Sequence, residues 1–207
     1  MAKLCIVGAC HTDTTYKLNG PAQHGRTNPG NSSALPGGVA ANIARYICRH
    51  RNDMKIIFVG AAATGNDDVA SELSDAGIDV TFARLDGSHP TYNAILDHNG
   101  ELIIGVADMA LYDAVRPTDI IPLLPEHLQA VIVDANFPAE TLVAIATSLS
   151  DDCRLYAAGT SVKKVQRLAP IMNRLDALVV NRDESCTLVG ERGNVDGLAT
   201  ILSARLR

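Results

Sequence analysis

The 207-residue chain carries 18 Lys and Arg against 23 Asp and Glu, a net charge of −5, and 47% of its residues are hydrophobic. This length and composition predict one sizeable α/β core. The acidic balance disfavours nucleic acid and anionic membranes as partners, and no apolar run approaches the roughly 18 residues of a membrane span. The first eight residues are typical of a buried strand and not of a signal peptide, which predicts a cytoplasmic protein.

The first quarter of the chain predicts a strand, a long polar segment and a helix. Residues 4–9 form an apolar run that is typical of a buried strand. Residues 10–36 are rich in Gly, Pro, Asn and Thr, and a segment this long predicts small strands or a functional loop. After Pro36-Gly37-Gly38, apolar residues recur with helical spacing over residues 39–49.

The next segment predicts further strands and a hairpin. Apolar patterns indicate strands over 55–60 and 78–84, with a helix between them over 66–76. A hairpin is expected over 92–106, because Asn99-Gly100 supplies the positive φ angles of a tight turn. The hairpin and the early polar segment do not fit the alternation of strands and helices in the rest of the chain. We therefore expect a small antiparallel flap with strands within 12–36 and 90–107.

The remaining half alternates strands with helices. Strands are expected over 130–134, 154–158 and 177–181, and helices over 138–149, 162–174, 183–189 and 195–205. This alternation predicts a parallel sheet with helices on both faces, in a single domain over residues 1–207. No strand follows the last helix, so the architecture is expected to be incomplete at its C-terminal end, with the apolar side of that helix exposed.

Two candidate sites lie in the first quarter of the chain: Asp13, after the first strand, and Gly37-Gly38, at the start of the first helix. Gly37-Gly38 allows a ligand to approach the backbone at a helix N-terminus, although ordinary helix initiation explains the pair equally well. Asp13 stands just past the first strand, where open α/β sheets bind ligands. Its carboxylate could accept hydrogen bonds from two sugar hydroxyls, or it could stabilise its own loop.

Polar residues also follow later strands. Asn136 is expected at the same edge of the sheet as Asp13. Asn181 and Glu184 lie three residues apart at a helix start, a spacing that suits water-mediated Mg²⁺ and equally suits helix capping. Lys164 could pair with a phosphate or be a solvated lysine on a helix.

These motifs, in this order, resemble those of the ribokinase (PfkB) family of carbohydrate kinases. The segments that carry the resemblance are Gly8-Ala9-Cys10-His11-Thr12-Asp13, residues 36–44 (Pro-Gly-Gly-Val-Ala-Ala-Asn-Ile-Ala) and Asn181-Arg182-Asp183-Glu184. Within the family the chain is most similar to pseudouridine kinases. That likeness rests on Thr27-Asn28-Pro29-Gly30, Thr91-Tyr92, residues 99–112 and Ser161-Val162-Lys163-Lys164.

The resemblance implies a ribokinase-like three-layer fold with a small β-lid, and ATP-dependent phosphorylation of a hydroxyl on a sugar or a ribosyl nucleoside. It implies that Asp13, Gly38 and Asn42 touch the sugar, and that Asn181 and Glu184 serve Mg²⁺ and phosphate. It also suggests a homodimer formed through the lid. The expected substrate-binding residues are Asp13, Asn28, Gly37, Gly38, Asn42, Thr91, Asn136 and Lys164.

The chain departs from the family pattern at three places. His11 stands where the family often has Asn, and Ala158-Gly159 stands where pseudouridine kinases often have Asp-Pro. The family's Gly-Ala-Gly-Asp motif, which carries the anion hole and the catalytic Asp, is absent from these 207 residues. We therefore expect no catalytic residue in this chain and an inactive kinase fragment. The alternative is a non-catalytic protein that binds a sugar or nucleoside.

Overall fold

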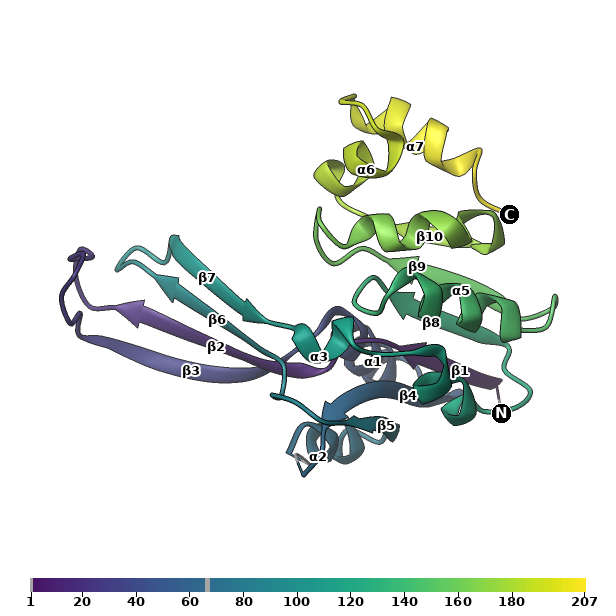
Figure 1. The fold of residues 1–207 in the computed structure, drawn as a ribbon, viewed down its shortest axis with the longest axis horizontal. Helices are drawn as coiled ribbons and strands as arrows, with labels where there is room; N and C mark the ends of the chain where they lie inside the picture. The colour runs from purple at the N-terminus through teal and green to yellow at the C-terminus, as the bar shows by residue number, and fades with distance from the viewer. Residues whose placement is uncertain (1, 66–67) are drawn as a thin grey trace.

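The computed structural model describes residues 2–65 and 68–207 and consists of a body and a small sheet that projects from it (Figure 1). The body is a six-stranded sheet in the order β10-β9-β8-β1-β4-β5, with every pairing parallel. Its strands are β1 (Ala2–Val7), β4 (Met54–Ala63), β5 (Asp79–Leu85), β8 (Ala130–Asp134), β9 (Arg154–Ala158) and β10 (Ala177–Val179). This confirms the predicted parallel sheet.

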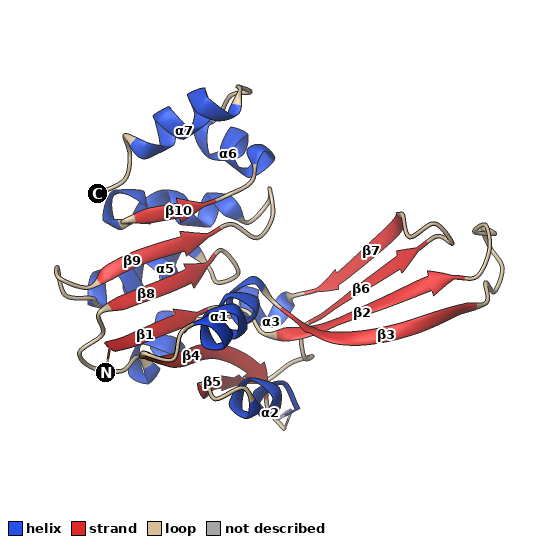
Figure 2. Ribbon diagram, turned by 180° about the vertical axis from the view of Figure 1, so that it is seen from behind, coloured by secondary structure: helices blue, strands red, loops and turns tan. Residues whose placement is uncertain are grey.

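Helices cover both faces of this sheet, as Figure 2 shows from behind. One face carries α1 (Val39–His50) and α2 (Asp68–Asp75). The helices on or beside the other face are α3 (Ala110–Asp113), α4 (Pro117–Ile120), α5 (Ala139–Ser148), α6 (Arg182–Val189), α7 (Val195–Ser203), and the 3₁₀ segments η1 (Ile121–Leu123) and η2 (Val165–Arg174).

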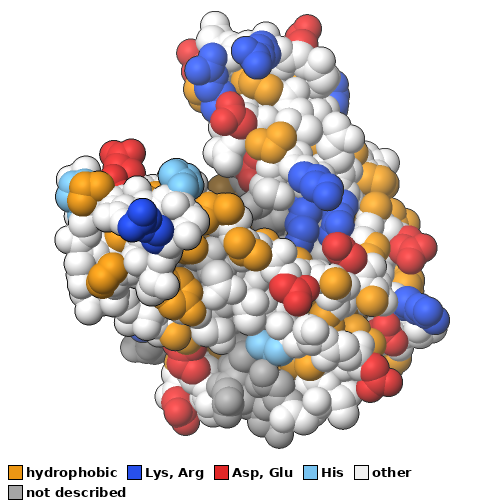
Figure 3. All heavy atoms as spheres, turned by 60° about the vertical axis from the view of Figure 1, so that its left-hand side comes forward, with side chains coloured by type: hydrophobic (Ala, Val, Ile, Leu, Met, Phe, Trp, Pro, Cys, Tyr) orange, Lys and Arg blue, Asp and Glu red, His pale blue; other side chains and the backbone are white. Residues whose placement is uncertain are grey.

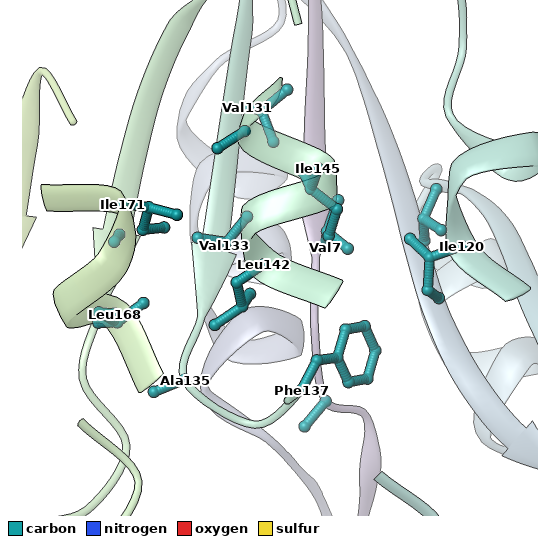
Figure 4. Packing of buried hydrophobic residues seen from close by; sticks show 14 of the residues in the cluster. Val7, Ile120, Val131, Val133, Ala135, Phe137, Leu142, Ile145, Leu168 and Ile171 are labelled. Carbon is teal, nitrogen blue, oxygen red and sulfur yellow. The ribbon is translucent and has the colours of Figure 1, made fainter. Parts of the chain in front are cut away.

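The alternation of side chains along each central strand explains the two hydrophobic layers. In β1, Cys5 and Val7 pack toward α5, whereas Leu4 and Ile6 pack toward α1. Both sets are buried, because parallel strands in an α/β sheet are covered on both faces. Figure 4 shows the larger layer, in which Leu142 and Ile145 of α5 belong to one cluster with Val7 of β1 and with Val131 and Val133 of β8.

The small sheet has four strands in the order β3-β2-β6-β7. Its strands are β2 (His11–Leu18), β3 (Gly30–Gly37), β6 (Thr91–Leu96) and β7 (Leu102–Asp108). The central β2–β6 pairing is parallel and the two outer pairings are antiparallel. The predicted turn between β6 and β7 contains Gly100 with φ of 92°, which is a conformation that glycine adopts without strain.

The register of the small sheet separates its two faces. Asp13 of β2 lies beside Tyr92 of β6, which in turn lies beside Ala107 of β7, so these three side chains share one face. Tyr16, Ile95 and Ile104 form another cross-strand row, on the opposite face because they are an odd number of residues away. Both faces carry exposed apolar side chains: Leu35, which pairs with Asp13, is 66% exposed, and Tyr16 and Ile104 on the second face are 44% and 51% exposed.

Some sequence expectations need correction. The helix expected over 162–174, with an interruption at Pro170, is the 3₁₀ segment η2, which begins at Val165; the proline lacks the N–H that continues an α-helix. The apolar side of the last helix is not left exposed, because Leu198 and Leu202 are buried against neighbouring elements. The short helices α3, α4 and η1 were not anticipated, and the first two residues of the helix expected over 66–76 lie outside the described residues.

One face of the sheet is only partly covered. On the α1 side, the part of the chain that the structure describes leaves a hollow of about 870 Å³ beside β8, β9 and β10. Its lining is mostly apolar and includes Tyr46, Ile132, Tyr156 and Val179, of which Tyr46 and Val179 are strongly exposed. Asn181 and Glu184 also line this hollow.

Candidate active site

A cleft of about 330 Å³ lies where the small sheet meets the carboxyl ends of the body strands. Figure 3 shows this side of the molecule, with Lys and Arg side chains gathered on the body beside the hollowed region. The carboxyl ends of parallel strands are where α/β sheets bind ligands. The lining residues are His11, Asp13, Gly38, Val39, Asn42, Tyr92, Ala107, Met109, Asn136, Thr160, Ser161 and Lys164.

Asp13 is placed in the cleft by β2 and held there by the adjacent strand. Its carboxylate packs on the Cα of Gly37, where a Cβ would overlap all three carboxyl atoms. The Oδ1 atom is buried and accepts no hydrogen bond from any described residue. Burial raises the pKa of Asp13, and the positive charge of Arg45 opposes this shift. The Asp13 side chain as a whole is 39% exposed, so the carboxylate can be reached by a ligand hydroxyl in the cleft.

His11 lies beside Asp13 at the base of the cleft. Its Nε2 atom is 3.2 Å from Asp13 Oδ1, and its Nδ1 atom is 3.4 Å from the hydroxyl of Tyr112. Burial lowers the pKa of His11 to about 4, although the negative charge of Asp134 acts in the opposite direction. The imidazole is therefore neutral at physiological pH. Sequence analysis noted His11 only as a departure from the family and did not include it in the site.

The glycine pair shapes the start of α1. Gly38 has φ of 98°, and a Cβ at this position would overlap the carbonyl oxygen of Ala9. A residue with a side chain would therefore push β1 and α1 apart. Asn42, one turn into α1, lines the cleft and its Oδ1 accepts a hydrogen bond from the Arg45 guanidinium.

Asn136 and Lys164 form the opposite wall of the cleft. The Lys164 ammonium donates a 2.8 Å hydrogen bond to Asn136 Oδ1, although the two residues are 28 positions apart in the sequence. Burial lowers the pKa of Lys164. Thr160, beside them, has a buried hydroxyl without a hydrogen-bond partner among the described residues. This end of the cleft therefore presents donors, whereas the Asp13 end presents an acceptor.

Two buried residues beneath the cleft, Tyr112 and Asp134, were not among the site residues expected from the sequence. Tyr112 donates a 2.7 Å hydrogen bond to the carbonyl of Cys10 and accepts one of 3.0 Å from the Cys10 N–H. Asp134, at the end of β8, is fully buried and accepts hydrogen bonds from several N–H groups. A carboxylate ending an apolar strand was visible in the sequence, but its partners are far away along the chain.

Asn181 and Glu184 form a reciprocal cap at the start of α6. Asn181 Oδ1 accepts from the Glu184 N–H at 2.9 Å, and Glu184 Oε2 accepts from the Asn181 N–H at 3.0 Å. The capping alternative therefore describes their observed contacts. The described residues contain no group of three or more His, Cys, Asp or Glu able to hold a metal. One amide and one carboxylate fit Mg²⁺ only where the ion keeps most of its water.

The structure places the remaining candidates away from the cleft lining. Asn28 lies between β2 and β3, and its side chain bonds to the backbone of Gln23 and Arg26 within that loop. Thr91 begins β6, and its hydroxyl lies 3.5 Å from the Asn93 amide nitrogen. Gly37 does not line the cleft, but it provides the surface on which Asp13 rests. The structure thus brings together Asp13, Gly38, Asn42, Asn136 and Lys164.

Comparison with known proteins defines the class to which this fold and cleft belong. The sequence profile of the pfkB family carbohydrate kinases matches residues 1–204, so the chain belongs to that family. The pseudouridine kinase of Escherichia coli is 22% identical over 190 residues, which cover 89% of this chain and 60% of the relative. The pseudouridine kinase of Arabidopsis thaliana is 30% identical over 198 residues, covering 86% of this chain and 48% of the relative.

Solved structures share the fold. A carbohydrate kinase from Agrobacterium tumefaciens superposes with a TM-score of 0.84 at 27% identity, over 99% of this chain and 67% of that chain. A ribokinase from Cryptococcus neoformans in complex with ADP superposes with a TM-score of 0.71 at 17% identity, over 99% and 67% of the two chains. The ribokinase-like fold expected from the sequence is confirmed. The chain spans about half to three fifths of the two pseudouridine kinases. No described helix is both long and apolar enough to cross a membrane.

Proposed function

We propose that this chain forms the acceptor-binding part of an ATP-dependent kinase that phosphorylates a hydroxyl of a sugar or a ribosyl nucleoside similar to pseudouridine. The observation that carries the proposal is the position of the Asp13 carboxylate in the cleft, where its side chain is 39% exposed and its Oδ1 lies 3.2 Å from His11 Nε2. A carboxylate held in this way can accept hydrogen bonds from sugar hydroxyls that enter the cleft. The similarity to two pseudouridine kinases supports a ribosyl nucleoside as the substrate class.

The two ends of the cleft fit the two parts of such a nucleoside. Asp13 can accept hydrogen bonds from adjacent ribose hydroxyls, and Asn42 stands on the same side. Lys164 and Thr160 can donate to the carbonyl oxygens of a uracil-like base. Asn28 and Thr91 stay candidates for substrate contacts only if the small sheet moves relative to the body.

ATP would bind beyond this cleft, toward Asn181 and Glu184, which share the adjacent hollow with Asn42 and Thr160. The ribokinase that was solved with ADP supports a nucleotide in this fold. Glu184 would hold a hydrated Mg²⁺ that neutralises phosphate charge, and Asn181 would orient Glu184 through the reciprocal cap. In this proposal the cleft residues bind and orient the acceptor, and the family's Gly-Ala-Gly-Asp segment supplies the group that removes the proton.

The small sheet would act as a lid and as a dimer contact. Its cleft-facing row of Asp13, Tyr92 and Ala107 would cover the bound sugar and exclude water. Its other face carries Tyr16, Ile104 and Val106, with exposed fractions of 44%, 51% and 55%. We propose that this second face binds the same face of a second copy.

Binding of pseudouridine to the purified 207-residue protein, measured by calorimetry, tests the acceptor site. Asp13→Ala should weaken binding at least tenfold and keep the native melting temperature, because each charge-assisted hydrogen bond is worth about 1.5–3 kcal/mol. Uridine and D-ribose provide the comparison ligands. Unchanged affinity in the variant would remove Asp13 from the site. Tight binding without any turnover in a longer polypeptide would favour the alternative, a non-catalytic binding protein.

A further inference from the structure

Asp134 lies beneath the acceptor cleft without lining it, and its carboxylate connects the segments that supply the cleft residues. Its side chain has no exposed surface. Oδ2 accepts hydrogen bonds of 3.1 Å from the Ala9 N–H and 3.1 Å from the Ala40 N–H. Ala9 precedes β2, which carries Asp13, and Ala40 lies in the first turn of α1, which carries Asn42. One oxygen atom thus fixes the relative position of two walls of the cleft.

The same carboxylate controls the third wall through Asn136. Asp134 Oδ1 accepts from the Asn136 backbone N–H at 2.9 Å, and Oδ2 accepts from the Asn136 side-chain nitrogen at 3.0 Å. A carboxylate can only accept hydrogen bonds, so the amide NH₂ of Asn136 must point toward Asp134. The amide oxygen must then point away, and it meets the Lys164 ammonium at 2.8 Å. The orientation of Asn136 is therefore determined by Asp134.

Asp134 is closely packed against the segments that carry Gly8 and Ala40. A Cβ on Gly8 would stand 2.5 Å from the Asp134 Cγ and 2.8 Å from the Cβ of Ala40. Arg167 adds a second constraint by donating a hydrogen bond to the Asn136 carbonyl and another, of 2.8 Å, to Asp113. Neither Asp134 nor its partners can shift without moving the cleft walls.

We propose that Asp134 is the positioning residue of the acceptor site, holding Lys164 in the cleft through Asn136 while it ties the Asp13 and Asn42 segments together. The proposal rests on the proposed function for the identity of the ligand, but the placement of Lys164 can be measured without any ligand. Asp134→Asn tests it, because an amide at this position can offer NH₂ to the Asn136 oxygen and so turn that oxygen away from Lys164.

The ligand-free measurement is the pKa of the Lys164 ammonium, followed by NMR on lysine-labelled protein. If Asp134 positions Lys164, Asp134→Asn releases the ammonium into water, and its pKa rises toward that of an exposed lysine, about 10.4. If Asp134 has only a structural role, Lys164 stays buried and loses an attractive negative charge, so its pKa falls further. The two outcomes have opposite signs, and a fall or an unchanged value overturns the proposal.

The ligand-binding measurement is a double-mutant cycle on pseudouridine affinity with Asp134→Asn and Lys164→Met. Positioning through Lys164 predicts that each single variant weakens binding at least tenfold and that the double variant is little worse than either one. Additive losses overturn the proposal. If the wild-type chain does not bind pseudouridine, the proposed function fails, and the Lys164 pKa alone decides the role of Asp134.

Asp176→Asn is the matched control. Asp176 also accepts a backbone hydrogen bond, of 2.8 Å from the Leu155 N–H, but at the start of β9 and so at the opposite end of the sheet. This variant should lower the melting temperature without changing pseudouridine affinity or the pKa of Lys164. If Asp134→Asn does not fold, Asn136→Ala keeps the Asp134 contacts to Ala9 and Ala40. It should release Lys164 in the same way, and an unchanged Lys164 pKa there overturns the proposal.

Discussion

The carboxylate of Asp13 rests directly on the Cα of Gly37, across the β2–β3 pairing, with no room for a methyl group between them. The glycine at position 37 is therefore required by a side chain on the neighbouring strand. Its own backbone conformation does not require it, since φ at Gly37 is not positive. The second glycine of the pair differs, because Gly38 has φ of 98° and is required by its backbone conformation as well.

In Gly37→Ala the new methyl group should displace the Asp13 carboxylate from its observed position, while the backbone at residue 37 stays unstrained. We expect pseudouridine affinity to fall at least tenfold, because the carboxylate can no longer present both oxygens to adjacent hydroxyls. Titration calorimetry at 25 °C measures the affinity, and thermal melting checks the fold. Gly20→Ala is the control, since a Cβ there meets nothing within 4 Å. Equal affinities of the two variants would show that the Asp13–Gly37 contact does not shape the site.

His11 should make the protein less stable as the pH falls from about 6.5 to about 4. Its pKa is lowered to about 4 by burial in the folded state, and an unfolded histidine titrates near 6.5, so over this range the unfolded chain binds the extra proton. The loss could reach about 3 kcal/mol at the acid end. The groups that face His11 or act on its charge are Asp13, Tyr112, His89, Asp134 and Lys164.

Urea unfolding of the wild type and of His11→Asn at pH 7, 6, 5 and 4 isolates this effect, because Asp13 titrates in both proteins. Asp13 itself has a raised pKa and so acts with the opposite sign, adding stability as the pH falls. The unfolding free energy of the wild type minus that of His11→Asn should therefore decrease as the pH falls from 7 to 4. A constant difference across the four pH values would mean that His11 is not buried in neutral form.

Secondary-structure elements whose burial pattern is local could be predicted from the sequence, whereas contacts between residues far apart along the chain could not. Strands and helices with regular apolar spacing, such as β8 and α1, were predicted nearly to the residue because their burial pattern is local. The segment over 162–174 was predicted as a helix interrupted by Pro170, because its apolar spacing is helical. The structure has a 3₁₀ segment there, since the proline lacks an N–H and its ring clashes with the preceding turn of an α-helix.

The candidate site could be predicted only where a residue acts through its own position on an element. Asp13 and Gly38 follow from the strand end and the helix start that the sequence marks, whereas Asn42 was selected from the family resemblance. Asp134 and Tyr112 act on backbone groups more than 90 residues away, and nothing in the local pattern indicates these partners. Asn28 was selected from a resemblance in sequence, whereas its observed contacts all lie within its own loop.

The β6–β7 hairpin should become protected when a ligand fills the cleft. All of β7 is exposed, so little apolar burial opposes its local opening. Tyr92 and Ala107 face the cleft from this hairpin, and closure over a sugar would order them. Hydrogen exchange with and without saturating pseudouridine should slow in Thr91–Asp108, with β9 as the internal reference. Identical exchange in the hairpin would argue against a lid.

The face of the small sheet that carries Tyr16, Ile95 and Ile104 should form the contact between the two copies of a dimer. Ile104→Lys places a charge in the row of Tyr16, Ile95 and Ile104, and burying that charge in an interface is costly. Sedimentation should show the wild type as a dimer and this variant as a monomer. Val195→Lys, at an exposed valine of α7, is the matched control and should leave the dimer intact. A wild type that sediments as a monomer at all concentrations would contradict the proposed contact.

The 207-residue polypeptide by itself should bind its acceptor yet transfer phosphate at no useful rate. Phosphorylating a hydroxyl needs a group to take its proton and donors to hold the charge that develops on the transferred phosphoryl group. A general base contributes about 10²–10⁴ in rate and one anion-hole donor about 10²–10³. These effects are not additive, so we expect a rate at least ~10⁴ below that of a longer polypeptide with the family's Gly-Ala-Gly-Asp segment. Asp196 and Asp183 stand at helix starts after the body strands, and neither lines the cleft: Asp196, between Gly193 and Gly197, is exposed in the first turn of α7, and Asp183 precedes Glu184 in the capped turn of α6. The measurement is transfer of labelled phosphate from ATP to pseudouridine by both polypeptides. Comparable turnover would show that the catalytic groups lie within residues 1–207.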